Sequence, residues 1–144
     1  MIENAINSLC DVVRECSYGL HKHLRHGHLE KIYKNGLAHR LKKANVDVVQ
    51  QAPVPVYDED GTILGDLNAD LFVSSELIVE LKAVRSVNDD HVAQLLGYLR
   101  GSGKRYGLFQ FRSAKTLHQA VCLGFGCLAF CVFLCFFVAK MIIQ

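Results

Sequence analysis

Residues 69–83 read ADLFVSSELIVELKA, two apolar runs separated by a short polar segment. The first run carries Asp70, and the second carries Glu80 and Lys82. Two such runs so close together predict a β-hairpin. Alternate residues of a strand share a face, so Glu80 and Lys82 project the same way. If the hairpin loop has an odd number of residues, Asp70 lies on that face too, about opposite Glu80.

Opposed in this way, Asp70 and Glu80 would repel each other by roughly 3–4 kcal/mol at an effective dielectric near 20. A divalent cation converts this repulsion into coordination, because hard cations take carboxylate oxygens as ligands. Lys82 would then stand beside the metal, able to orient a water or stabilise a charged phosphorus centre. The alternative is a surface hairpin whose Glu80 and Lys82 are simply solvated. These three residues alone do not decide between the two.

The chain has 144 residues, which predicts one domain or one domain plus a tail. Its formal net charge of +2 gives no strong electrostatic footprint for nucleic acid. It has six cysteines but no Cys-x-x-Cys spacing, and its start lacks the basic and apolar stretches of a signal peptide. We therefore expect reduced thiols and a cytoplasmic domain.

Composition changes sharply near residue 120, which separates a domain over 1–118 from an apolar tail over 119–144. Residues 121–139 contain no charged or strongly polar side chain, and this length suits a single membrane-spanning helix. The basic residues that flank this stretch weakly favour a cytoplasmic N-terminal domain anchored by its tail. The alternatives are a buried C-terminal helix or a tail that is not native to the domain.

Apolar periodicity predicts the remaining elements of the chain. Helices are expected over 2–24, about 29–43 and 86–100, the last opened by a capping box at 86–89. Strands are expected over about 46–56, 63–73, 77–84 and 106–111. Pro53 and Pro55 mark the first strand as an edge or an irregular stretch. The order is helix, helix, three strands, helix, strand, which predicts an α/β fold.

Three further polar residues lie on the predicted helices. Glu30 shares a helix flank with apolar residues, which tilts its carboxylate towards the protein body. Its alternative role is that of a favourable partner for the helix dipole. Gln94 and Tyr98, four positions apart, form a polar stripe on the following helix.

Five blocks in this order resemble the GxxExxY proteins, a bacterial and archaeal group within the PD-(D/E)XK nuclease superfamily. The blocks lie at 21–24, 27–33, 69–71, 78–84 and 94–99, and the likeness runs from about residue 3 to residue 118. The resemblance implies a restriction-endonuclease-like αβββαβ core, a mixed sheet flanked by helices, to which this chain adds an extra apolar C-terminal helix. The chain departs from the group at Arg25-His26, where relatives have Gly-Pro, at Asn68, where they often have Arg, and in its apolar tail.

The resemblance also implies roles for single residues. Asp70 and Glu80 would be the central metal ligands and Glu30 the helical acidic residue that completes the metal site. Lys82 would be the catalytic lysine, with Gln94 and Tyr98 as its supporting pair.

The expected function is therefore metal-dependent hydrolysis of a phosphodiester in nucleic acid, with DNA as the favoured substrate and Mg²⁺, or Mn²⁺ in its place, as cofactor. The alternative is a catalytically silent module on the same scaffold that binds nucleic acid or protein. Either form is compatible with a homodimer and with membrane contact through 121–139.

Overall fold

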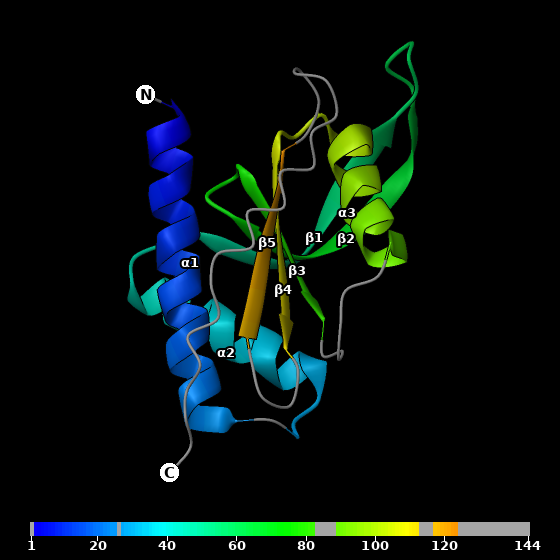
Figure 1. The fold of residues 1–144 in the computed structure, drawn as a ribbon. Helices are drawn as coiled ribbons and strands as arrows, with labels where there is room; N and C mark the ends of the chain where they lie inside the picture. Colours follow the sequence, from blue (N-terminus) through cyan, green and yellow to red (C-terminus); the bar gives the residue numbers. More distant parts are fainter. Residues whose placement is uncertain (1, 26, 83–88, 113–116, 124–144) are drawn as a thin grey trace.

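The structure is a computed structural model that describes residues 2–25, 27–82, 89–112 and 117–123. Three helices and five strands lie in these ranges (Figure 1). In chain order they are α1 (Ile2–Leu24), α2 (Glu30–Lys43), β1 (Val48–Tyr57), β2 (Ile63–Val73), β3 (Leu77–Lys82), α3 (Asp89–Ser102), β4 (Tyr106–Arg112) and β5 (Leu117–Leu123).

The strands form one mixed sheet in the order β1-β2-β3-β4-β5. Neighbouring strands are antiparallel except β3 and β4, which are parallel and are connected through α3. Parallel neighbours need such a crossover because a tight turn reverses the chain. The mixed α/β sheet predicted from the sequence is confirmed, and β1 lies at its edge, as the two prolines predicted.

Strand β5 is the main difference from the expected order. The sequence predicted a single strand after α3 and an apolar tail from residue 119, whereas residues 117–123 pair with β4 in antiparallel register. A short apolar run does not distinguish a strand from a helix by periodicity, and here a neighbouring strand supplies the pairing. The rest of the tail, including the predicted C-terminal helix and most of 121–139, lies outside the described residues. Within the described ranges, no helix is long and apolar enough to cross a membrane.

The core has two parts, one on each face of the sheet. Helices α1 and α2 pack on one face, where their apolar residues meet Leu71, Val73, Leu77, Val79 and Leu81. Helix α3 packs on the other face through Leu95, Tyr98 and Leu99, against Ile78 and Val54. Figure 1 shows the sheet between α1 with α2 on one side and α3 on the other. The middle strand β3 is therefore covered on both faces, as its nearly continuous burial shows.

The predicted helix boundaries agree closely with α1 and α2. Helix α3 begins at Asp89 and ends at Ser102. The first three residues of the predicted capping box, 86–88, fall outside the described ranges.

Candidate active site

The register of the β2–β3 hairpin places Asp70 opposite Glu80. Paired residues run from Val73↔Leu77 to Leu71↔Val79, so the turn consists of residues 74–76. Its three residues are the odd number that the sequence argument required. Ser74 and Ser75 both adopt positive φ angles, 51° and 57°, which reverse the chain within this short loop.

The backbone pairing of β2 and β3 ends at Leu71↔Val79, and beyond it the carboxylates of Asp70 and Glu80 accept the backbone amides. The amide of Asp70 donates to Oε1 of Glu80 at 3.2 Å, and the amide of Leu81 donates to Oδ2 of Asp70 at 3.1 Å. Each carboxylate thus accepts a backbone N–H from the facing strand. Carboxylates held by backbone amides are fixed in position more firmly than solvated ones. The alternative of a merely solvated surface hairpin therefore does not describe this end of β3.

An irregularity in β1 lies at the same level of the sheet. The β1–β2 ladder passes from Gln50↔Leu71 to Ala52↔Ala69 and skips the position where Gln51 would face Asp70. Gln51 has a φ of 51°, unusual for a residue other than glycine, and its Nε2 donates to Oδ1 of Asp70 at 3.3 Å.

The apolar residues on either side of this level pack in different parts of the core. Leu71 belongs to the cluster under α1 and α2, whereas Ala69, two positions earlier, belongs to the cluster under α3. Residues two apart on a regular strand share a face. Strand β2 therefore changes the face it buries at Asp70, and simple alternation does not describe the orientation of this side chain.

Lys34 of α2 supplies the positive charge nearest to Asp70 among the described contacts. Its Nζ lies 3.2 Å from Oδ1 of Asp70, and the two side chains are only 16% and 14% exposed. Sequence reasoning missed both Lys34 and Gln51. A signal for Lys34 was present, since it follows Glu30 by four positions and so lies on the same stripe of α2.

Glu80 is the buried acid of the site, since this residue is only 2% exposed. Burial, followed by the negative charge of Asp70, raises its pKa from 4.5 to about 8. The hydrogen bond from the Asp70 amide and the positive charge of Lys82 act in the opposite direction. At neutral pH and without a metal, Glu80 therefore mostly holds its proton. Lys82 itself is half-buried at the end of β3, on the side that Glu80 faces.

Gln94 and Tyr98 are the residues of α3 that lie on the side of the same carboxylates. Nε2 of Gln94 donates to the Tyr98 hydroxyl at 3.1 Å, which confirms that the predicted stripe is a hydrogen-bonded pair. Burial, then the charge of Glu80, raises the pKa of Tyr98, and Asp70 adds to this effect. The phenol therefore lies within electrostatic range of both carboxylates.

Glu30 opens α2 and is half-buried, and the loop before it is tightly organised. Gly27 has a φ of 105°, a conformation that favours glycine. The Tyr33 hydroxyl donates to the carbonyl of Arg25 at 2.6 Å and accepts from the amide of His28 at 3.3 Å. The glycine and tyrosine of this segment thus fix where the helix begins, and with it the position of Glu30.

A site with all three carboxylates is not assembled in the structure. Within the ranges it describes, no three His, Cys, Asp or Glu side chains gather closely enough to hold a metal ion. Asp70 and Glu80 come together, and Glu30 does not join them. The pair still fits Mg²⁺, which keeps several waters and commonly takes one or two carboxylates. The ammonium of Lys34 against Asp70 shows that this oxygen already attracts a cation.

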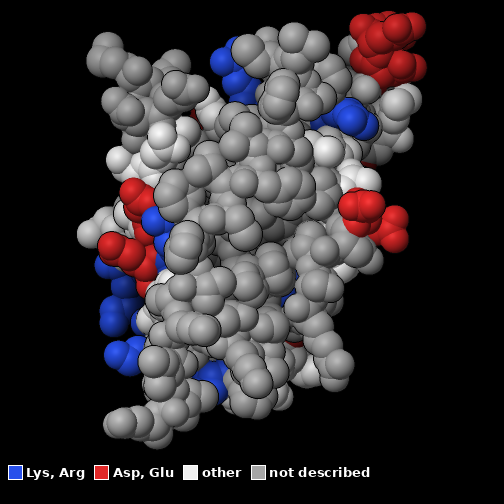
Figure 2. All heavy atoms as spheres, viewed as in Figure 1, with Lys and Arg blue, Asp and Glu red and all other residues white. Residues whose placement is uncertain are grey.

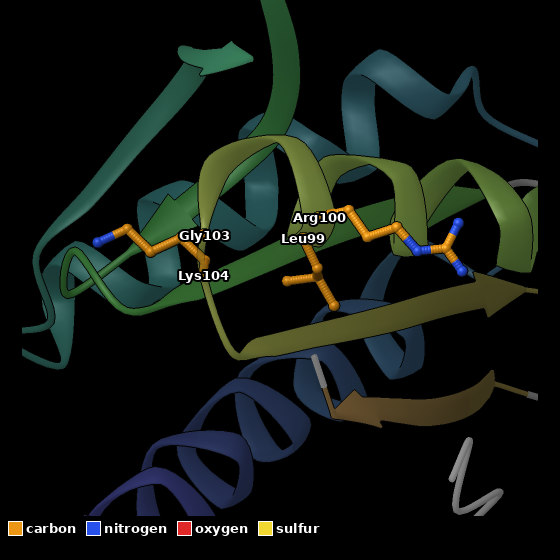
Figure 3. Close-up of a pocket in the computed structure, with 4 residues that line it drawn as sticks. All are labelled: Leu99, Arg100, Gly103 and Lys104. Carbon is orange, nitrogen blue, oxygen red and sulfur yellow. The ribbon is translucent and has the colours of Figure 1, made fainter. Parts of the chain in front are cut away.

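The described surface also has two cavities that contain none of the predicted site residues. One, of about 310 Å³, lies at the end of α3 and is lined by Leu99, Arg100, Gly103 and Lys104 (Figure 3). Figure 3 shows the Arg100 and Lys104 side chains pointing in opposite directions, so they do not converge on one anion. Lys104 instead donates to the carbonyl of Ser75 at 3.1 Å. The other, of about 280 Å³, lies beside the start of α1.

A family model described as the PD-(D/E)XK nuclease superfamily matches residues 7–121. The matched range contains all six predicted site residues, which are Glu30, Asp70, Glu80, Lys82, Gln94 and Tyr98, and it ends within β5. No curated protein and no solved structure matches the chain significantly.

Proposed function

The chain belongs to the PD-(D/E)XK nuclease superfamily, and we propose that it is a metal-dependent phosphodiester hydrolase that cleaves DNA with Mg²⁺, or Mn²⁺ in its place, as cofactor. Membership suggests a nuclease-like activity, but a fold alone does not establish a reaction. The observation that carries the proposal is that the Asp70 and Glu80 carboxylates each accept a backbone amide of the facing strand, from Leu81 and Asp70, with Lys82 two positions after Glu80.

In this proposal Asp70 and Glu80 hold the cation, and Glu30, which does not join them in the structure, becomes a third ligand only if its side chain moves towards them from α2. When bound, the metal lowers the pKa of a coordinated water and offsets negative charge on the phosphate. Glu80 has to give up the proton on its carboxyl group first, because only the carboxylate is a ligand. Metal binding is therefore expected to release a proton.

Lys82 then acts on the reacting phosphate. It lies on a strand of the sheet rather than on a loop, so its ammonium is presented from a rigid position. There it can orient the attacking water or stabilise the charge that develops on phosphorus. Gln94 and Tyr98 are positioning residues, since Gln94 donates to the Tyr98 hydroxyl, which lies within electrostatic range of Glu80.

The distribution of charge limits where nucleic acid approaches. Figure 2 shows acidic side chains gathered at the tip of the β1–β2 hairpin, where Asp58, Glu59 and Asp60 are exposed. This tip would repel a phosphate backbone. We therefore expect the substrate to reach the carboxylates from the side of α2 and the end of β3, where Lys34 and Lys82 lie.

The direct test is cleavage by the full-length chain. Plasmid, single-stranded DNA and RNA are incubated with the protein in MgCl₂ or in EDTA. We expect DNA cleavage that needs Mg²⁺ and that Lys82→Ala abolishes, while Lys22→Ala, a change of an exposed α1 lysine, leaves it unchanged. Wild-type rates in a folded Lys82→Ala protein would refute the catalytic role of this lysine.

One observation favours a second candidate, the catalytically silent module that binds nucleic acid or protein. Glu30 does not join the other two carboxylates among the described residues, and a two-carboxylate site binds metal more weakly than a complete one. Calorimetric titration with Mn²⁺ separates the candidates. If wild type binds Mn²⁺ and Asp70→Asn does not, the hydrolase is supported. If the heat of titration is the same in wild type and Asp70→Asn, the module is supported.

The narrower assignment to the GxxExxY group rests on the five sequence blocks, and the conformations of Gly27 and Tyr33 agree with it. A cytoplasmic domain tethered by residues 121–139 is likewise part of the proposal. Fractionation of cells that express the chain with or without residues 124–144 tests the tether. Full-length protein found wholly in the soluble fraction would exclude it.

A further inference from the structure

Lys34 contacts the same oxygen that the proposed metal would need. Its Nζ lies 3.2 Å from Oδ1 of Asp70, while Oδ2 accepts the amide of Leu81. Oδ1 is therefore the atom of Asp70 on which cationic and polar side chains converge, because Gln51 also donates to it at 3.3 Å. The sequence did not predict that Lys34 or Gln51 would contact Asp70, the expected metal ligand.

The two donors differ in charge, and this difference matters for a metal. Gln51 is neutral, so its amide can remain near Asp70 when a divalent ion arrives. Lys34 carries a positive charge in a partly buried position, where charges are screened weakly. An ammonium and a divalent cation on one carboxylate oxygen would repel each other strongly.

We propose that Lys34 is a built-in counter-cation: it neutralises Asp70 in the metal-free protein and has to leave Oδ1 when a divalent ion binds. The inference rests on the proposed function and names a residue that regulates its metal site. Lys34 thereby lowers the affinity for metal and compensates the negative charge of Asp70, whose side chain is only 14% exposed. The displacement needs no movement of α2, because a long lysine side chain that is 16% exposed can rotate towards solvent.

The exchange has a thermodynamic consequence that a purely structural salt bridge lacks. If the metal and the ammonium compete for one oxygen, removing the ammonium must tighten metal binding. It must also destabilise the metal-free protein more than the metal-bound one, because only the metal-free form uses the ion pair. A structural bridge unrelated to the metal would lower stability equally in both forms.

The test is a calorimetric titration of the full-length chain with Mn²⁺, together with thermal unfolding in EDTA and in saturating Mn²⁺. The variants are Lys34→Met, and Lys34→Gln, which keeps a hydrogen-bond donor without the charge. Lys42→Met, an exposed lysine two turns further along α2, is the matched control for loss of one positive charge.

We expect both Lys34 variants to bind Mn²⁺ about fivefold more tightly than wild type, the factor that corresponds to loss of a competing ion pair of about 1 kcal/mol. Their unfolding temperature should fall in EDTA and approach the wild-type value in Mn²⁺. Lys42→Met should change neither quantity. A second measurement on the wild type, the side-chain ammonium resonance of Lys34, should shift when Mg²⁺ is added.

The outcomes separate this inference from the function on which it rests. If wild type binds Mn²⁺ and the folded Lys34 variants bind it equally or more weakly, the exchange is refuted while the hydrolase proposal stands. If neither wild type nor variants bind Mn²⁺, both proposals fail. Equal loss of stability with and without Mn²⁺ would also overturn the exchange and leave a structural salt bridge.

Discussion

Replacing Glu80 by Gln should make the pH dependence of stability directly visible. The pKa of Glu80 is raised from 4.5 to about 8 in the native protein, chiefly by burial and then by Asp70. Between these pH values, the native state holds a proton that the unfolded state has released. The free energy of unfolding therefore falls as pH rises, by about 1.4 kcal/mol per pH unit. From pH 4.5 to pH 7, the loss from this one group reaches about 3 kcal/mol.

Gln has nearly the shape of protonated Glu and its carbonyl can still accept the Asp70 amide, but it does not titrate. The stability of Glu80→Gln relative to wild type should therefore increase with pH, by about 1.4 kcal/mol per unit between pH 5 and 7.5. The assay is urea unfolding in EDTA at four pH values. Glu76→Gln, a change of an exposed glutamate in the turn of the same hairpin, is the control.

A constant difference between Glu80→Gln and wild type across this pH range would refute the argument that burial keeps Glu80 protonated. The same measurement in saturating Mn²⁺ adds a second condition. A bound metal needs the carboxylate, so wild type should become the more stable protein at pH 7. Glu76→Gln should run parallel to wild type in both conditions.

Three further predictions concern single substitutions. Tyr33→Phe removes the hydroxyl that ties the α1–α2 loop together, and urea unfolding should show a loss of about 1–3 kcal/mol. Gly107→Ala would place a Cβ 2.9 Å from the Leu95 side chain, and we expect the free energy of unfolding to fall by about 1–3 kcal/mol. The control, Gly97→Ala, adds a Cβ that meets nothing within 4 Å and should not destabilise the protein. Equal melting temperatures for the two variants would contradict this prediction. Asp70→Asn should weaken Mn²⁺ binding in calorimetry by at least tenfold, and unchanged affinity would remove this residue from the metal site.

Much of the site could be predicted because it depends on short-range geometry. The spacing of Asp70 and Glu80 and the length of the turn between them fix their register, and the structure has that register. The helical spacing of Gln94 and Tyr98 likewise fixes their contact. The change of buried face in β2 at Asp70 was not predictable, because alternation assumes regular strands. Gln51, with its positive φ, interrupts the regular pairing of β1 with β2 at this position.

The sequence by itself determined the elements of this protein from α1 to β4 and the pairing of its two central carboxylates, since both follow from the local periodicity of the chain. Only the tertiary structure decided that Lys34 pairs with Asp70, that Glu80 is buried and has a raised pKa, and that 117–123 form a strand. Each of these depends on a partner far away in the sequence. Burial, countercharge and strand pairing are properties of what surrounds a residue, and the residue's own neighbours along the chain do not specify them.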